Sequence, residues 1–156
     1  MRSVTSKTEY ATLAILELAK AQSKNELASA QEIADKYGLS SPFMGNVLQI
    51  LKRASLVETE RGAHGGFRLI PKPDEITLGY VAALIETEER KNRPNRSEEL
   101  ATRSRSPRKD AASQTRDKLH EIWQNAEIKR QEYLNSILFS DLLERNEVEQ
   151  TFNYTI

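Results

Sequence analysis

Apolar residues recur at helical spacing in the first part of the chain. Between Ser6 and Gln22 they return every three to four positions, which predicts a helix with one buried face. A shorter helix is predicted from Ala30 to Tyr37, because the sequence Ser29-Ala-Gln-Glu32 has the pattern of a capping box. Gly38 is expected to end this helix, since glycine readily takes the left-handed conformation that follows a last helical turn.

A third helical pattern follows in LSSPFMGNVLQILKRASL. Ser41 is predicted to cap this helix, with Pro42 in its first turn, where the missing N–H costs no hydrogen bond. The residues expected on the core side are Phe43, Val47, Ile50 and Leu51, and those expected on the free side are Met44, Asn46, Gln49 and Arg53. Amide side chains beside basic ones can read base edges, and the alternative is an ordinary solvated face.

The pattern then changes to alternation. LVETE predicts a strand, RGAHGG a turn and FRLI the returning strand. A phosphate-binding loop would need Lys and Ser or Thr at a helix start after the glycines, whereas Phe67 begins a strand pattern. A site on His64 would need ligating neighbours, and the other histidine, His120, is remote in the sequence. The turn accounts for the glycines, because hairpin connections require positive φ.

The second half of the chain is predicted to be helical around a polar interruption. Residues 74–88 predict an acidic-capped connecting helix, residues 89–113 a flexible basic loop, residues 114–145 a long helix to about Leu138 with a short helix after it, and residues 146–156 a tail. The long helix carries an apolar stripe suited to a dimer seam. Its residues are Leu119, Ile122, Trp123, Ala126, Tyr133, Leu134 and Ile137.

These elements predict a mostly α fold with a small β-hairpin. Residues 1–73 are expected to form a winged helix-turn-helix DNA-binding domain, whose third helix enters the major groove. Arg61, at the shoulder of the hairpin, is expected to enter the minor groove. The long C-terminal helix is then the dimerisation helix.

Composition narrows the function further. The formal net charge is zero, but residues 90–118 carry 10 basic against 4 acidic side chains, so a basic face can form locally. The absence of cysteine excludes thiol catalysis and cysteine-based zinc sites. No catalytic motif and no long apolar run occur, so we expect a cytoplasmic protein that is not an enzyme and has no membrane partner.

The order of motifs resembles the Rrf-two (IscR/NsrR/CymR-like) family of bacterial transcription regulators. The resemblance is carried by SVTSKTEYATLAILELA, SAQEIADKYGLSSPFMGNVLQILKRASLV, RGAHGGFRL, PDEITLGYVAALIE, and HEIW with YLNSILFSDLL after it. It implies a homodimer that crosses its long helices and binds a palindromic operator in double-stranded DNA. With the residues singled out above, it gives these candidate DNA contacts: Thr5, Lys7, Tyr10, Ser40, Ser41, Phe43, Asn46, Gln49, Arg53, Arg61 and His64.

Many members of that family hold an iron-sulfur cluster through three cysteines, and thiolates are the ligands that such clusters need. This chain has none, so no cofactor and no metal site are expected. Glu9 and His120 match or lie near ligand positions of some members and would be vestigial. The expected function is a repressor that responds to a small-molecule or protein effector. The alternative is a winged-helix module that binds another protein, or a regulator controlled by a partner protein or a small ligand, without strong DNA affinity of its own.

Overall fold

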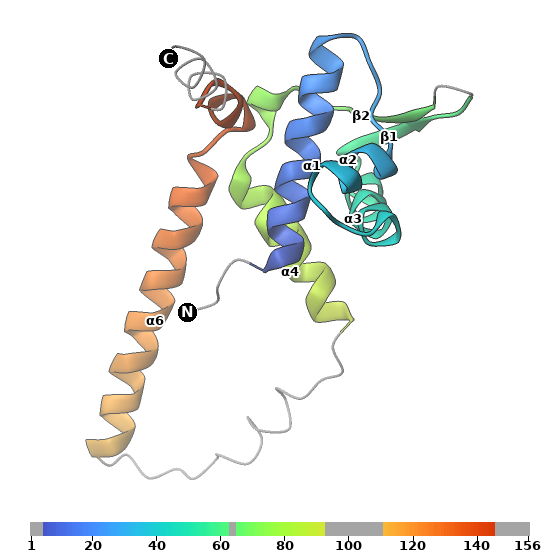
Figure 1. The fold of residues 1–156 in the computed structure, drawn as a ribbon. Coiled ribbons are helices and arrows are strands. Elements are labelled where there is room, and N and C mark those ends of the chain that lie inside the picture. The colour runs from blue at the N-terminus through green and yellow to red at the C-terminus, as the bar shows by residue number, and fades with distance from the viewer. Residues whose placement is uncertain (1–4, 63–64, 93–110, 146–156) are drawn as a thin grey trace, which may run out of the picture.

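A computed structural model describes residues 5–62, 65–92 and 111–145 of the chain (Figure 1). The elements are α1 (Ser6–Ser23), α2 (Ala30–Lys36), α3 (Ser41–Arg53), β1 (Val57–Glu60), β2 (Gly66–Leu69), the 3-10 turn η1 (Pro73–Glu75), α4 (Leu78–Lys91) and α6 (Ala111–Asn135). Residues 139–145 form one further helical segment. The mostly helical fold with an antiparallel two-stranded hairpin is therefore confirmed. No helix of the described residues is both long and apolar enough to cross a bilayer.

The first three helices begin at the polar residues that cap them. Thr5 accepts a hydrogen bond from the backbone N–H of Thr8 and starts α1. Ser29 and Glu32 form the predicted capping box of α2. The cap of α3 is Ser40, which accepts from the N–H of Phe43, and not Ser41, which was predicted. Two adjacent serines offer the same cap chemistry, so the sequence pattern leaves the choice open by one residue.

Two further predictions about helices are corrected by the structure. Met44 was placed on the free side of α3 but is fully buried. The helix predicted over residues 74–88 is instead the 3-10 turn η1 followed by α4, which starts after the cap Thr77. The turn brings Ile76 into the core, 1 % exposed, and this burial outweighs the acidic start signal.

One continuous core includes residues from α1 to the segment that follows α6. It includes Leu18 of α1, Leu48 of α3, Val81 of α4 and Phe139, all fully buried. Phe139 comes from the segment after α6, where its N–H donates to the carbonyl of Ile76 at 3.0 Å. The division of the chain into domains stays a prediction, but the connecting helix and the chain after α6 pack on the same core as the first three helices.

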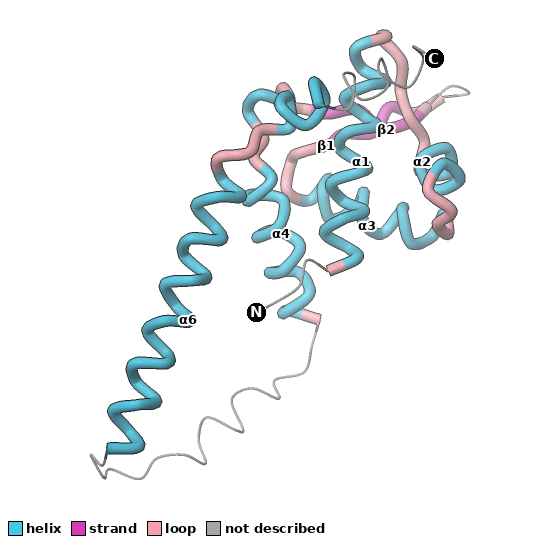
Figure 2. Tube along the Cα trace, turned by 60° about the vertical axis from the view of Figure 1, so that its left-hand side comes forward, coloured by secondary structure: helices cyan, strands magenta, loops and turns pink. Residues whose placement is uncertain are grey.

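The long helix α6 lies along one side of the molecule, with its start far from the other helices (Figures 1 and 2). It ends at Asn135, so Ile137, predicted as part of the dimer stripe, lies beyond the helix. The carbonyl of Ile137 accepts a hydrogen bond from the N–H of Leu78 at the start of α4. Residues 93–110, most of the predicted loop, and the predicted tail 146–156 lie outside the described residues.

Candidate nucleic-acid interface

The exposed side of α3 carries both amides that the sequence singled out. Asn46 and Gln49 are exposed, and neither makes a hydrogen bond with a described residue. They lie three positions apart and therefore share one side of the helix. Val47, Leu48 and Leu51 hold the opposite side in the core. The amides are thus presented by a rigid, buried helix, which is the arrangement that base reading requires.

The start of α3 lies against the start of α1. The ring edge of Tyr10 in α1 meets Phe43 in α3, with centroids 5.5 Å apart and planes at 88°. Phe43, predicted to contact DNA, is half-buried by this packing, so its main contact is with α1. Thr5 and Lys7, predicted to touch phosphates, are half-buried at the same end of α1. This packing places the predicted phosphate-contacting residues of α1 next to the start of α3.

The other end of α3 is tied to its neighbours by basic side chains. Lys52 donates a hydrogen bond to the hydroxyl of Thr59 on β1 at 2.8 Å. Arg53, predicted to contact DNA, forms an ion pair with Glu88 of α4 at 3.0 Å. Hydrogen bonds from Lys91 and then Arg53 lower the pKa of Glu88. Arg53 would therefore have to leave Glu88 to reach a phosphate.

The hairpin has the register Glu60 opposite Gly66, which leaves residues 61–65 as the connection. Of its glycines, only Gly62 has a positive φ, at 141°. A Cβ on Gly65 would lie 2.5 Å from the carbonyl oxygen of Glu60, and a Cβ on Gly66 would lie 3.0 Å from that of Ala28. The prediction that positive φ explains all three glycines is therefore wrong. Gly65 and Gly66 are required by close backbone approach.

The two arginines of the hairpin differ in their partners within the protein. Arg61 is exposed and makes no hydrogen bond or ion pair with the described residues. His64 lies outside the described residues. Arg68 on β2 pairs with Glu58 at 2.7 Å and with Glu60 at 3.2 Å, so its charge is already balanced. Arg61 is therefore the cation of the described hairpin that is available to an external partner.

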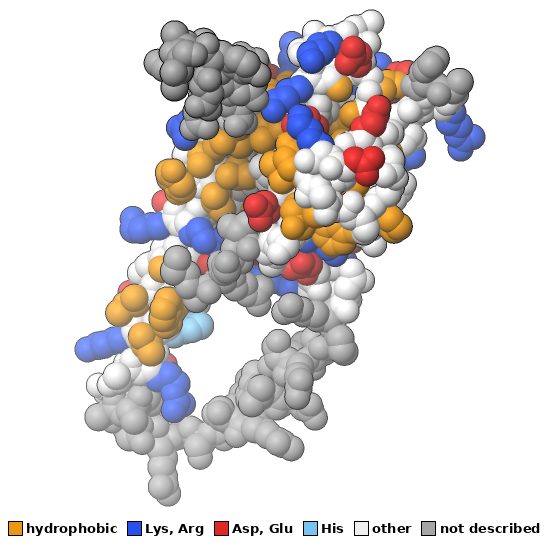
Figure 3. Space-filling view, in the orientation of Figure 1, with side chains coloured by type: hydrophobic (Ala, Val, Ile, Leu, Met, Phe, Trp, Pro, Cys, Tyr) orange, Lys and Arg blue, Asp and Glu red, His pale blue; other side chains and the backbone are white. Residues whose placement is uncertain are grey.

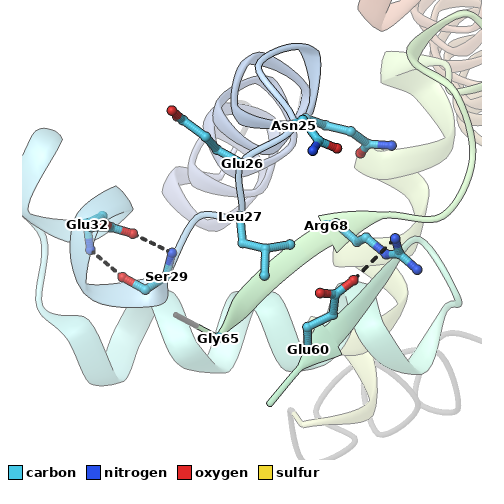
Figure 4. A pocket seen from close by; sticks show the side chains of 9 residues that line it. Asn25, Glu26, Leu27, Ser29, Glu32, Glu60, Gly65 and Arg68 are labelled. Atoms are coloured by element: carbon cyan, nitrogen blue, oxygen red, sulfur yellow. Dashed lines mark hydrogen bonds and ion pairs between the residues drawn. The ribbon is translucent and has the colours of Figure 1, made fainter. Parts of the chain in front are cut away.

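A polar groove separates the hairpin from the segment that joins α1 to α2 (Figure 4). It encloses about 840 Å³. Three carboxylates line it, but Glu32 binds Ser29 and Glu60 binds Arg68, as the dashed lines show. Ala28 of that segment and Phe67 of β2 form an isolated antiparallel bridge. These contacts brace the root of the wing against the helical unit.

A charged cluster fixes α2 on α1. Glu17 accepts hydrogen bonds from Lys36 at 2.5 Å and from the hydroxyl of Tyr37 at 2.8 Å. Burial opposes ionisation of Glu17, but these hydrogen bonds and the nearby Lys20 together lower its pKa. Burial and the contact with Glu17 raise the pKa of Tyr37. The short helix α2 is thus held in place relative to α1, and it packs on α3 and supports that helix.

The side chains of α6 are unusually open. Every described side chain from 114 to 129 is exposed. The apolar ones include Leu119, Ile122 and Trp123, which are 52 %, 63 % and 53 % exposed, and hydrophobic side chains gather along this helix in Figure 3. Of the other residues in the predicted stripe, Ala126 and Tyr133 are exposed and Leu134 is half-buried. Large apolar side chains that gather on an exposed helix are typical of an interaction surface.

The residues present do not fit an iron or iron-sulfur site. The chain has no cysteine. Within the described ranges, no three His, Asp or Glu side chains come together in a way that could hold a metal ion. Glu9 is exposed in the first turn of α1, and His120 is exposed on α6, where it shares a hydrogen bond with Gln124 at 2.9 Å. Single oxygen or nitrogen donors on separate helices do not replace the thiolates of a cluster.

Comparison with known proteins agrees with this geometry. The sequence model of the Rrf2 family, described as an iron-dependent transcriptional regulator, matches residues 4–145. The HTH-type transcriptional regulator IscR of Aliivibrio salmonicida is 28 % identical over 147 residues, which cover 94 % of this chain and 80 % of IscR. IscR of Vibrio atlanticus is 28 % identical over 145 residues, which cover 93 % and 77 %.

Solved structures give the same assignment of the fold. That of T. potens IscR superposes with a TM-score of 0.71 at 24 % identity and covers 96 % of this chain and 91 % of its own. That of CymR (YrzC), the global cysteine regulator of B. subtilis, has a TM-score of 0.68 at 25 % identity, with coverages of 93 % and 98 %. The relatives are transcriptional regulators and not enzymes. The chain, a helix-turn-helix with a hairpin wing and a long C-terminal helix, belongs to the Rrf2 family of DNA-binding transcriptional regulators.

Proposed function

We propose that this regulator is a homodimeric repressor that binds a palindromic operator and blocks transcription by occupying it. The observation that carries the proposal is the pair of exposed amides Asn46 and Gln49, which make no hydrogen bond with a described residue and lie on a helix whose other side is buried in the core. An amide side chain can donate and accept at once, which matches the major-groove edge of adenine. Arg61 would enter the adjoining minor groove from the wing.

The homodimer is supported by the part of α6 that contacts α4 within the same chain. Gln131 of α6 donates to the carbonyl of Gly79 in α4 at 3.1 Å, and Arg130 pairs with Glu86 at the same distance. A Cβ on Gly79 would lie 2.8 Å from the backbone nitrogen of Asn135, so the two helices are in close contact here. The contact with α4 is therefore made by polar side chains near the end of α6.

The apolar residues of α6 lie before this contact along the helix. Leu119 and Trp123 precede Arg130 by about two turns or more, in the stretch 114–129 where every described side chain is exposed. A second copy of the same helix would cover this apolar side through a twofold interface, as closed symmetric dimers do. Two reading helices would then be presented to two half-sites of DNA, which makes the operator palindromic.

The proposed regulator works without an iron-sulfur cluster, because its sequence supplies no thiolate. Its signal would then be a small molecule or a partner protein. An ultraviolet-visible spectrum and an iron assay on freshly purified protein test this point, and stoichiometric iron with cluster absorption would contradict it.

The DNA-binding proposal is tested by selecting duplexes with the purified chain and measuring their binding at two salt concentrations. We expect a palindromic consensus and affinity that falls as salt rises, because phosphate contacts release counterions. Asn46→Ala should cost about 1–3 kcal/mol at one base pair of each half-site. Arg61→Ala should relax the preference for A·T pairs in the flanking minor groove.

Two variants serve as matched controls. Gln124→Ala removes an exposed amide from α6, and Lys24→Ala removes an exposed cation from the end of α1, so both should leave operator binding unchanged. Unchanged binding in Asn46→Ala and Arg61→Ala would refute the residue assignment. No selected duplex at low salt would instead favour a winged helix used for protein contact.

A further inference from the structure

Gly45 occupies the middle of α3, in a position where the fold does not need glycine. Its φ is not among the positive values, which among the glycines of the described residues occur at Gly38 and Gly62. A Cβ added to Gly45 would have no heavy atom within 4 Å apart from its own helix and chain neighbours. Neither backbone conformation nor packing within the protein explains the missing side chain.

Glycine at this position has a cost. In a helix interior it is less favourable than alanine, because it loses more conformational freedom on folding. Gly65 and Gly79 differ in this respect, since a Cβ on either would lie less than 3.0 Å from a neighbouring backbone atom. The reason for Gly45 must therefore be sought outside the protomer.

The place of Gly45 on the helix indicates what approaches it. At about 100° per residue, Gly45 falls between Gln49 and Lys52, within the exposed side that also carries Asn46. A reading helix with ordinary side chains is about 10–12 Å across, close to the width of about 12 Å of the major groove. Asn has a short side chain, so its amide reaches a base edge only when the helix backbone lies deep in the groove.

We propose that Gly45 is a specificity-determining residue, whose missing side chain lets α3 enter the major groove deeply enough for Asn46 and Gln49 to contact base edges. This inference rests on the proposed DNA-binding function and deepens it. A side chain at position 45 would meet the base edges first and hold both amides away from them. Binding to non-specific DNA would be much less affected, because it rests on the attraction between basic side chains and phosphates and not on base contacts.

The test uses the full chain and the duplex selected by the wild-type protein. Gly45→Ala should raise the thermal midpoint by about 2–4 °C, because alanine favours the helix. The same substitution should weaken binding to the selected duplex by about tenfold, the loss expected when one base pair is misread. Gly45→Leu should weaken it further without lowering the thermal midpoint. Binding to a random duplex at low salt should stay within about twofold of the wild type, since phosphate contacts dominate it.

Ala83→Ser is the matched control, because it adds one heavy atom to an exposed position of α4, and it should leave operator affinity unchanged. Wild-type affinity in both Gly45 variants would overturn the inference while leaving the proposed function intact. A lower thermal midpoint in Gly45→Ala would also overturn it, because the fold itself would then require glycine. Failure of the wild type to select any duplex would overturn the proposed function and this inference together.

Discussion

The most informative single perturbation of the proposed dimer seam is Trp123→Ala. The side chain is 53 % exposed and lies about two helical turns before Arg130 and Gln131, the residues of α6 that contact α4. A buried aromatic side chain removes up to about 250 Å² from water, so covering the exposed half of Trp123 would bury about 130 Å². At about 25 cal/mol per Å² this amounts to up to about 3 kcal/mol in each protomer.

A twofold dimer loses this contribution twice. The loss of about 4–6 kcal/mol per dimer should raise the dimer dissociation constant by about 10³ to 10⁴. Sedimentation equilibrium across a broad range of protein concentration measures this constant directly. Operator binding should weaken in parallel, because half-site pairing depends on the dimer, while the helical circular dichroism of the winged-helix unit should persist.

Glu121→Ala is the matched control, since Glu121 is exposed two positions away, on the opposite side of α6. It should leave the dissociation constant unchanged. A change smaller than about tenfold in Trp123→Ala would refute the reasoning, because so small an effect means that the indole is not in the seam.

Two further predictions concern stability. Phe139→Ala should lower the free energy of unfolding, measured by urea titration, by about 3–5 kcal/mol, because the ring is fully buried beside Ile76. A loss below about 1 kcal/mol would show that the residues after α6 are not part of the core. Glu17→Gln should cost about 1–2 kcal/mol at neutral pH, since it loses charged hydrogen bonds with Lys36 and Tyr37. The folded-state pKa of Glu17 is lowered. This stabilisation is therefore present above the unfolded pKa of about 4.3 and is lost as the pH falls through the folded pKa. A difference in stability between the two variants that persisted in strong acid would contradict this reasoning.

Local sequence signals succeeded where the physics is local. The capping box of Ser29 and Glu32 formed as predicted, because both partners lie within one helical turn. The hairpin also formed where alternation predicted it, with β1 and β2 in antiparallel register. Such features depend on neighbours in the chain, and the sequence displays those neighbours directly.

The failures share a different cause. The sequence around Ile76 has the pattern of a first helical turn. In the structure Ile76 is buried in the same core as Phe139, more than sixty residues later, and the backbone forms a 3-10 turn before α4 begins. The sequence predicted that Arg53 would be available to DNA, but Glu88 of α4 forms an ion pair with it in the structure. The close approach that requires Gly66 likewise comes from Ala28, in a segment remote in sequence. No local pattern reports contacts of this kind.

The sequence by itself determined the order and type of the elements, the absence of thiolate ligands and the resemblance to a regulator family, because periodicity, capping and composition are properties of the chain. The tertiary structure decided which candidate side chains remain available. It leaves Asn46, Gln49 and Arg61 without a partner among the residues that it describes, half-buries Phe43 and pairs Arg53 with Glu88. It also separated the glycines that the fold requires from Gly45, which the fold does not require, because only packing in three dimensions shows where a side chain would fit.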